Sequence, residues 1–132
     1  MAQIAVVDDK EIIRESLSEA LTREEHAVTT FADPLEALTA MKDQRFDAAL
    51  VDLKMPGLDG LSLIREIRGA NCETPIIVMT AFATVSTAVE AMKLGAFDYV
   101  QKPFEVETVT VLLERALEHA RRSHGRRQQR TG

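Results

Sequence analysis

The chain has 132 residues, of which 45% are hydrophobic, enough for one domain with a buried core. No apolar run approaches the roughly 18 residues of a membrane span, and Lys10 and Glu11 interrupt the first apolar run too early for a signal peptide. The only cysteine, Cys72, excludes an internal disulfide bond, so a cytoplasmic protein is the simplest interpretation.

Charge is distributed unevenly along the sequence. The formal net charge is −5, but the last 18 residues hold six of the 16 basic residues and one of the 21 acidic residues. The rest of the chain therefore carries 10 basic and 20 acidic residues. An acidic body with a basic end argues against nucleic-acid binding by the body. The histidines His26, His119 and His124 are scattered and are predicted to be solvated.

The first half of the chain alternates strand and helix patterns. A continuous apolar run predicts a strand over Gln3–Asp8, and apolar residues three or four positions apart predict an amphipathic helix over Lys10–Thr22. A weaker strand, His26–Phe31, is expected near a sheet edge. Asp33 and Pro34 fit the N-cap and the first position of a second helix. The buried face of that helix is predicted to comprise Leu35, Leu38 and Met41.

The second half continues the alternation. The run Phe46–Asp52 predicts a fully buried strand that ends on a carboxylate, and a turn rich in Pro and Gly follows it. Further strands are predicted over Pro75–Met79 and Phe97–Gln101. Helices are predicted over Leu61–Arg68, over Thr84–Leu94 with Gly95 closing it, and from Val106 onwards. The helix Thr84–Leu94 is apolar on more than one face, which fits either a well-buried helix or a partner surface.

Five strands alternating with five helices predict an α/β protein with a five-stranded parallel sheet covered on both faces. The flavodoxin-like, doubly wound order 2-1-3-4-5 is the natural winding for such a chain. Its ligand crevice lies at the carboxyl ends of the first and third strands. Those strands end in Asp8-Asp9 and in Asp52, so acidic side chains are expected to gather there.

The residues at the strand ends form a chemically coherent set: Asp8, Asp9, Asp52, Thr80 and Lys102. Three carboxylates repel one another unless a cation is present, and oxygen ligands with room for water suit Mg²⁺. Metal, ammonium and hydroxyl groups together can hold the oxygens of a phosphoryl group in transfer. Asp52 is then the expected nucleophile, forming an aspartyl phosphate. Asp8 and Asp9 are expected to hold the metal, with the Lys54 carbonyl as a further ligand.

Each of these residues alone has a simpler interpretation. An aspartate before a Pro-Gly turn is often only a turn former, a threonine often only caps a helix, and Lys102-Pro103 alone is an ordinary loop. The full set, in order and with each member at a strand end, favours the phosphoryl-transfer interpretation.

The motifs resemble the receiver domain of two-component response regulators over about residues 3 to 120. The segments that carry the resemblance are Val6–Asp9, Val51–Gly57, Met79–Ala81, Gly95–Tyr99 and Tyr99–Phe104. The resemblance implies that a histidine kinase phosphorylates Asp52, and that Asp9, Asp52 and the Lys54 carbonyl hold Mg²⁺ while Asp8 orders the site. It also implies that Thr80 and Tyr99 form a switch pair and that the Lys102-Pro103 bond is cis. In the family, positions like Lys54 and Phe82 tune the phosphate lifetime.

The stretch Thr80–Phe104 is most similar to receivers of the nitrogen- and dicarboxylate-response type. Those usually precede an ATPase domain acting on sigma-54 RNA polymerase, followed by a DNA-binding domain. The resemblance therefore implies a receiver domain over 1–120, a basic tail or linker start over 121–132, and a transcriptional output. It also implies that the domain catalyses only its own phosphorylation and dephosphorylation. A homodimer through the fourth helix, fifth strand and fifth helix is a further expectation.

Two other functions compete with this interpretation. A stand-alone receiver could relay phosphate or dock on a partner protein. A Mg²⁺-dependent phosphatase with an aspartyl nucleophile, of the haloacid-dehalogenase kind, needs a second acid two residues after the nucleophile. Lys54 stands at that position and cannot act as the general acid, and the chain leaves no room for a cap domain.

Overall fold

The computed structural model describes residues 2–55, 59–70, 72–81 and 85–131, with side chains up to residue 122. The strands in these ranges are β1 (Gln3–Val7), β2 (Ala27–Phe31), β3 (Ala48–Asp52), β4 (Ile76–Thr80) and β5 (Asp98–Gln101). The helices that alternate with them are α1 (Glu11–Arg23), α2 (Pro34–Asp43), α3 (Gly60–Gly69), α4 (Val85–Lys93) and α5 (Val106–Thr131). Every predicted element is present, and the ends differ by only a few residues.

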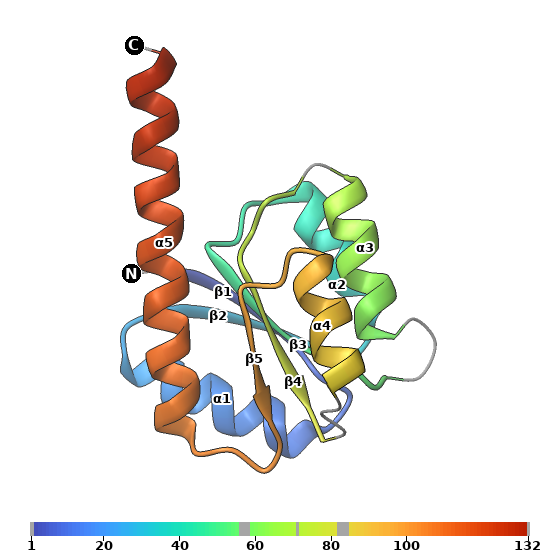
Figure 1. Ribbon diagram of the computed structural model, residues 1–132. Helices are drawn as coiled ribbons and strands as arrows, with labels where there is room; N and C mark the ends of the chain where they lie inside the picture. Colours follow the sequence, from blue (N-terminus) through green and yellow to red (C-terminus); the bar gives the residue numbers. More distant parts are fainter. Residues whose placement is uncertain (1, 56–58, 71, 82–84, 132) are drawn as a thin grey trace.

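The strands form one parallel sheet in the order β2-β1-β3-β4-β5 (Figure 1). The predicted fold class and strand order are therefore confirmed. β2 lies at an edge, as its weaker apolar pattern indicates, whereas β3 and β4 are buried at every residue. The switch in winding direction places the carboxyl ends of β1 and β3 side by side, which is where such sheets open onto a ligand crevice.

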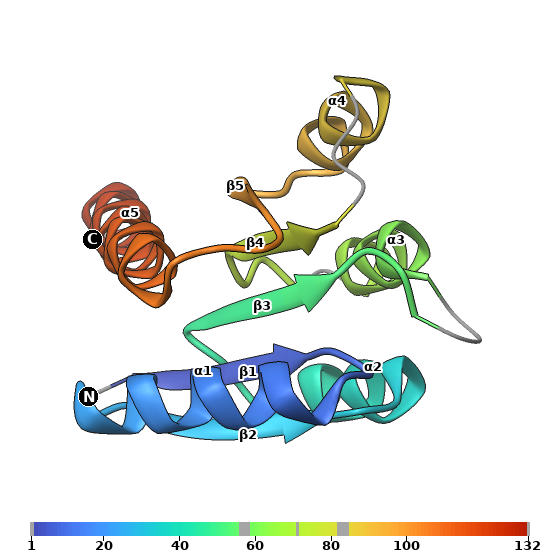
Figure 2. The ribbon, with the colours of Figure 1, turned by 90° about the horizontal axis from the view of Figure 1, so that it is seen from below.

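The helices cover the two faces of the sheet as two separate layers (Figure 2). α1 and α5 pack on one face around Leu17, Leu50 and Leu113, and α2, α3 and α4 pack on the other around Val51 and Ile64. Burying one such aliphatic side chain contributes about 1.5–3 kcal/mol to folding. The two apolar layers hold the strand ends, and thus the acidic residues on them, in fixed positions.

The buried face of α2 differs from the prediction. Leu35 is 58% exposed, whereas Ala37 is fully buried and Leu38 only partly. The side chain of Asp33 accepts a hydrogen bond from the Leu35 amide at 2.9 Å, so the helix begins at Pro34 as predicted. The inward stripe then runs through Pro34, Ala37 and Met41, at the three- and four-residue spacing of a helix.

The prediction of a solvated His26 is wrong. Its side chain is 9% exposed, and its Nδ1 accepts a hydrogen bond from the backbone N–H of Ala2 at 3.2 Å. Its Nε2 lies 3.2 Å from the Glu114 carboxylate on α5. The ring therefore ties α5 to the edge of the sheet, a long-range contact without a local sequence signal. His119 is exposed, as predicted, and the side chain of His124 lies outside the described part of the structure.

Helix α5 extends well beyond the sheet (Figure 1). It continues without a break from Val106 to Thr131, so no change of secondary structure marks residue 120. Apolar positions such as Val109, Leu113 and Ala116 hold its first part against the sheet. No helix in the described residues is long and apolar enough to cross a membrane.

Gly60 permits α3 to begin directly against the end of β3. A Cβ atom at this position would lie 2.4 Å from the carbonyl oxygen of Asp52 and 2.6 Å from the Cα of Leu53. Because both obstacles are backbone atoms, they cannot rotate away. Only glycine therefore allows this approach, which places the first turn of α3 beside Asp52.

We expect the substitution Gly60→Ala to lower the free energy of unfolding by about 1–3 kcal/mol, the usual cost of overpacking. Gly69→Ala is the matched control at the other end of the same helix, because its Cβ would meet nothing within 4 Å. That variant should be neutral or more stable by up to about 1 kcal/mol, since alanine favours helix more than glycine does. Urea denaturation of both variants measures the difference, and equal effects would contradict the packing argument.

Candidate functional site

Three carboxylates meet at the carboxyl ends of β1 and β3. One oxygen from each of Asp8, Asp9 and Asp52 lies within 4.8 Å of the others. Asp8 is fully buried and Asp52 is 3% exposed. The structure thus brings together the acidic residues that the sequence predicts to meet. Buried carboxylates so close together are costly unless cations or hydrogen-bond donors surround them.

Both carboxylate oxygens of Asp8 accept hydrogen bonds. Its Oδ1 accepts a hydrogen bond from the backbone N–H of Lys10 at 2.9 Å, and its Oδ2 accepts one from the Lys102 ammonium at 2.7 Å. The Asp8 carbonyl oxygen accepts a further bond from Arg14 Nη1 at 2.9 Å. These contacts fit a residue that orders the site more than one that offers a free oxygen to a metal.

Lys102 bridges the two buried acids, Asp8 and Asp52. Its Nζ lies 3.5 Å from Asp52 Oδ2, in addition to its shorter contact with Asp8, and the side chain is 11% exposed. The backbone N–H of Lys102 donates to the Thr80 carbonyl at 2.7 Å, which anchors this segment to the end of β4. The peptide bond between Lys102 and Pro103 is cis, as the sequence resemblance implies.

The surroundings of Asp52 raise the pKa of its carboxyl group. Burial, and then the neighbouring Asp8 carboxylate, raise its pKa above the ordinary value, although Lys102 and the backbone N–H of Lys54 act in the opposite direction. That N–H donates to Asp52 Oδ1 at 3.3 Å. The carboxylate is therefore held by few donors and destabilised by its surroundings, and an added cation would stabilise its ionised form.

Asp9 shows that the site suits a divalent metal. Its Oδ1 is buried and accepts no hydrogen bond within the described residues. Leaving a buried charged oxygen without a partner costs free energy, and a metal ion removes that cost. Carboxylate oxygens with space for water are the ligands that Mg²⁺ prefers. The residues present therefore fit Mg²⁺ held by Asp9 and Asp52, whereas the ligand role of the Lys54 carbonyl stays a prediction.

The two predicted switch residues occupy different environments. Thr80 ends β4, next to the end of β3, and is 3% exposed. Tyr99 lies on β5, opposite Val78 in the strand register, and is 41% exposed. The aromatic ring thus reaches solvent in this conformation. Phe82 and the Pro56-Gly57 turn, which the sequence also singles out, lie outside the described residues.

Two residues that shape the site were not predicted from the sequence. Arg14 donates a hydrogen bond to the backbone carbonyl of Asp8, and Gly60 allows the start of α3 to pack directly against the backbone of Asp52. The available signals were weak: a basic residue within the helix that follows Asp8-Asp9, and a glycine after the turn that follows Asp52. Neither pattern indicates a contact with the acidic cluster before the fold is known.

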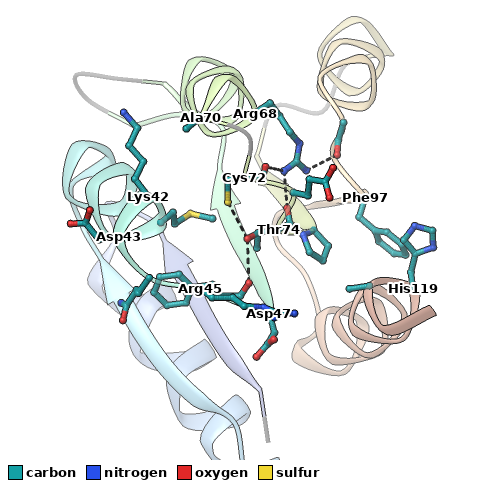
Figure 3. Close-up of a pocket in the computed structure, with 17 residues that line it drawn as sticks. Lys42, Asp43, Arg45, Asp47, Arg68, Ala70, Cys72, Thr74, Phe97 and His119 are labelled. Atoms are coloured by element: carbon teal, nitrogen blue, oxygen red, sulfur yellow. Dashed lines mark hydrogen bonds between the residues drawn. The ribbon is translucent and has the colours of Figure 1, made fainter. Parts of the chain in front are cut away.

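A separate groove of about 1160 Å³ lies at the opposite end of the sheet (Figure 3). Arg68 dominates one wall and donates hydrogen bonds to the carbonyl oxygens of Cys72, Thr74 and Gly95. Thr74 in turn donates to the Phe46 carbonyl at 3.2 Å. These bonds join α3, the start of β4 and the α4–β5 turn. The groove is thus a structural junction, far from the acidic cluster.

Comparisons with known proteins identify the family of this fold and site. The family model described as the response regulator receiver domain matches residues 4–114. The chain belongs to this family. The receiver domain is 41% identical over 114 residues to NtrC of Escherichia coli, described as a DNA-binding transcriptional regulator, and 39% identical over 116 residues to the regulatory protein AtoC. It is also 39% identical over 117 residues to the transcriptional regulatory protein FixJ of Bradyrhizobium diazoefficiens.

The receiver domain spans only part of these relatives. The matches cover 86–89% of the chain but 24% of NtrC, 25% of AtoC and 57% of FixJ. Among solved structures, NtrX from Brucella abortus superposes with a TM-score of 0.90 at 34% identity, over 98% of this chain and 30% of NtrX. FixJ-N superposes with a TM-score of 0.83 at 37% identity, over 90% of this chain and 95% of FixJ-N.

Proposed function

We propose that this receiver domain is the phosphoacceptor of a two-component system, in which Asp52 takes a phosphoryl group from a histidine kinase. The observation that supports this most strongly is that Asp52 lies with Asp8, Asp9 and the Lys102 ammonium at the carboxyl ends of the strands. A carboxylate oxygen of Asp52 attacks phosphorus, the bond from phosphorus to the kinase imidazole breaks, and the imidazole leaves.

The surrounding residues have separate tasks in this proposal. Asp9 and Asp52 hold Mg²⁺, with the Lys54 carbonyl as a further ligand, and Asp8 orders the site. Lys102 offsets negative charge on the transferred group, and the Thr80 hydroxyl bonds one of its oxygens. Mg²⁺, when bound, supplies the positive charge that stabilises the equatorial phosphoryl oxygens. Water later removes the phosphoryl group, so the domain acts only on itself and turns over no separate substrate.

The output is proposed to be transcriptional, through a longer chain. The relatives NtrC and FixJ are described as transcriptional regulators, and the receiver domain spans only part of each. Residues 1–120 then form the receiver domain, and residues 121–132 begin a linker, in which α5 continues as far as Thr131. An ATPase domain acting on sigma-54 RNA polymerase and a DNA-binding domain would follow. Nucleic acid is bound there and not by the acidic receiver domain.

The stand-alone receiver remains the second candidate, and the phosphatase is disfavoured. An open reading frame that continues into an ATPase domain would support the first function over the second. The phosphatase would need an acid at position 54, where the exposed Lys54 stands. Release of phosphate from small phosphomonoesters by the purified chain would support the phosphatase function instead.

Incubation with acetyl phosphate tests the central proposal. In the presence of Mg²⁺ we expect one phosphoryl group per chain, located by mass spectrometry on the peptide that contains Asp52. Chelation of the metal by EDTA should prevent the modification. An adduct on any other residue, or an adduct that forms equally well without divalent metal, would contradict the proposed site.

The surface over α4, β5 and α5 supports a switch in partner binding. Of the two interpretations left open for α4, a partner surface fits better than a well-buried helix, because in the described part of this helix only Ala91 is buried. The exposed large apolar side chains on these three elements are Val85, Val89, Met92, Tyr99 and Val111. An exposed apolar patch marks an interaction site, and a homodimer through this surface is the simplest symmetric outcome.

Beryllofluoride with Mg²⁺, which mimics the phosphoryl group, should shift amide resonances around α4 and β5 as well as near Asp52. The reason is that Thr80 is expected to bond the new oxygens, which lets Tyr99 turn inward and shifts a pre-existing equilibrium. Thr80→Ala should reduce the remote shifts at least several-fold. Thr39→Ala, on the exposed face of α2, is the control and should leave them intact. Shifts confined to the acidic cluster in the wild-type chain would rule out this switch.

A further inference from the structure

Arg14 contacts the backbone that leads from the end of β1 to the metal-binding acid. Its Nη1 donates a hydrogen bond to the carbonyl oxygen of Asp8 at 2.9 Å, and its side chain is half-buried. The pairing of β1 with both β2 and β3 ends at Val7, so Asp8 is the first residue beyond the ladders. Arg14 therefore supplies a donor where the regular sheet pairing stops.

The peptide group that Arg14 holds is shared by Asp8 and Asp9. Its oxygen belongs to Asp8 and its N–H belongs to Asp9, so its plane fixes the Asp9 Cα and the N–Cα bond from which the Asp9 side chain is placed. The Asp8 amide donates to the Phe31 carbonyl at 3.1 Å, and the Asp8 carboxylate is held by Lys10 and Lys102. Within the residues that the structure describes, the buried Oδ1 of Asp9 has no such contact.

We propose that Arg14 is a positioning residue of the phosphoacceptor site, which orients the Asp9 carboxylate toward Mg²⁺ by fixing the Asp8–Asp9 peptide. This inference rests on the proposed function, because it assumes that Asp9 holds the metal. Removing a group that orients a metal ligand without touching the metal itself typically lowers the metal affinity about 10- to 100-fold. Arg14 touches neither the metal nor the phosphoryl group in this role.

Magnesium titration of Arg14 variants, followed by amide chemical shifts, tests the proposal. Arg14→Met keeps the aliphatic part of the side chain but removes the donor, and should weaken Mg²⁺ binding about 10-fold. Arg14→Lys keeps a donor of shorter reach and should recover part of the affinity. Arg23→Met removes an exposed arginine from the other end of α1 and should leave the Mg²⁺ affinity unchanged. Without Mg²⁺, the Asp9 amide resonance should move in Arg14→Met and stay in Arg23→Met.

The phosphorylation rate with acetyl phosphate separates this role from its competitors. If Arg14 only positions Asp9, saturating Mg²⁺ should restore the rate of Arg14→Met to near that of the wild type. A rate that stays low at saturating Mg²⁺, with unchanged metal affinity, would show that Arg14 contacts the phosphoryl donor and would overturn the inference. If the difference in Mg²⁺ affinity between the wild type and Arg14→Met disappears at high salt, the effect comes from charge alone, and the inference is also overturned.

The failure of this inference differs from a failure of the proposed function. If the wild-type chain binds Mg²⁺ and is phosphorylated on Asp52, but Arg14→Met and Arg14→Lys bind the metal equally well, only the role of Arg14 is rejected. If the wild-type chain itself binds no Mg²⁺, the proposed function fails first. Should Arg14→Met not fold, as judged by circular dichroism, the affinity and rate of the folded Arg14→Lys variant decide.

Discussion

Replacing Asp52 by asparagine is expected both to abolish phosphorylation by acetyl phosphate and to raise the stability of the metal-free protein at neutral pH. The first effect follows from loss of the nucleophile. The second follows from electrostatics, because burial and the nearby Asp8 carboxylate disfavour the ionised form of Asp52 and raise its pKa. Asparagine keeps the shape of the side chain and removes the buried negative charge.

The sign of the pH dependence follows from the raised pKa of Asp52. In the folded chain this carboxyl binds its proton more tightly than in the unfolded chain, so its contribution to stability is most favourable at low pH. That contribution is lost as the pH rises from the ordinary carboxyl pKa through the raised folded value. The stabilising effect of Asp52→Asn should therefore be small in acid, where Asp52 is protonated in the folded and in the unfolded chain, and should grow toward neutral pH.

Thermal unfolding at several pH values measures this effect. Each kcal/mol of relieved repulsion should raise the melting temperature by roughly 4 °C in a domain of this size. Glu66→Gln, which neutralises an exposed acid on α3, is the control and should show little change. Saturating Mg²⁺ should reduce the difference in melting temperature between Asp52→Asn and the wild type, because the metal offsets the negative charge of Asp52. A variant less stable than the wild type at neutral pH without metal would contradict the electrostatic argument.

The parts of the fold that the sequence predicts are those set by local pattern. Continuous apolar runs marked the two fully buried strands β3 and β4, and a weaker pattern marked the edge strand β2. The position of the site could be predicted for a topological reason. In a parallel sheet all carboxyl ends of the strands lie on the same side, so residues that follow different strands, such as Asp8 and Lys102, meet in space.

Features that depend on contacts between distant elements were not predictable. His26 is buried because Glu114, 88 positions away, lies beside it, and no periodicity reports such a pair. Leu35 is exposed because the inward stripe of α2 is set by where α2 meets the sheet, and a stripe displaced by one residue fits the apolar pattern equally well. Which face of α4 is exposed likewise depended on how the helix packs, since its sequence is apolar on several sides.

Replacing Lys102 by methionine is expected to lower the stability of the metal-free domain, whereas Asp52→Asn is expected to raise it. Lys102 is the cation between Asp8 and Asp52, with its side chain 11% exposed and the two acids almost completely buried. Methionine fills similar space but leaves the carboxylates facing each other without that charge. Removing one partner of a buried ion pair costs about 3–5 kcal/mol, and the Lys10 amide that remains on Asp8 favours the lower value.

The melting temperature of Lys102→Met should accordingly fall by roughly 10 °C at neutral pH without metal. Lowering the pH should reduce the loss: Lys102 lowers the pKa of Asp52, so without it that carboxyl takes up its proton more readily. Mg²⁺ should also restore part of the stability, since it brings positive charge to the same acids. Lys42→Met, at an exposed position on α2, is the matched control and should change the melting temperature by little.

A double-mutant cycle can divide the effect of Lys102 between its two acidic partners. The ammonium lies 2.7 Å from Asp8 and 3.5 Å from Asp52, so its coupling to Asp8 should be the larger of the two. Lys102→Met should therefore cost less in the Asp52→Asn background than alone. It should still destabilise the domain, because the buried Asp8 carboxylate then loses its only ion-pair partner among the described residues. A neutral effect in that background would mean that Lys102 acts on Asp52 alone, and that the shorter contact with Asp8 contributes nothing to the stability of the folded domain.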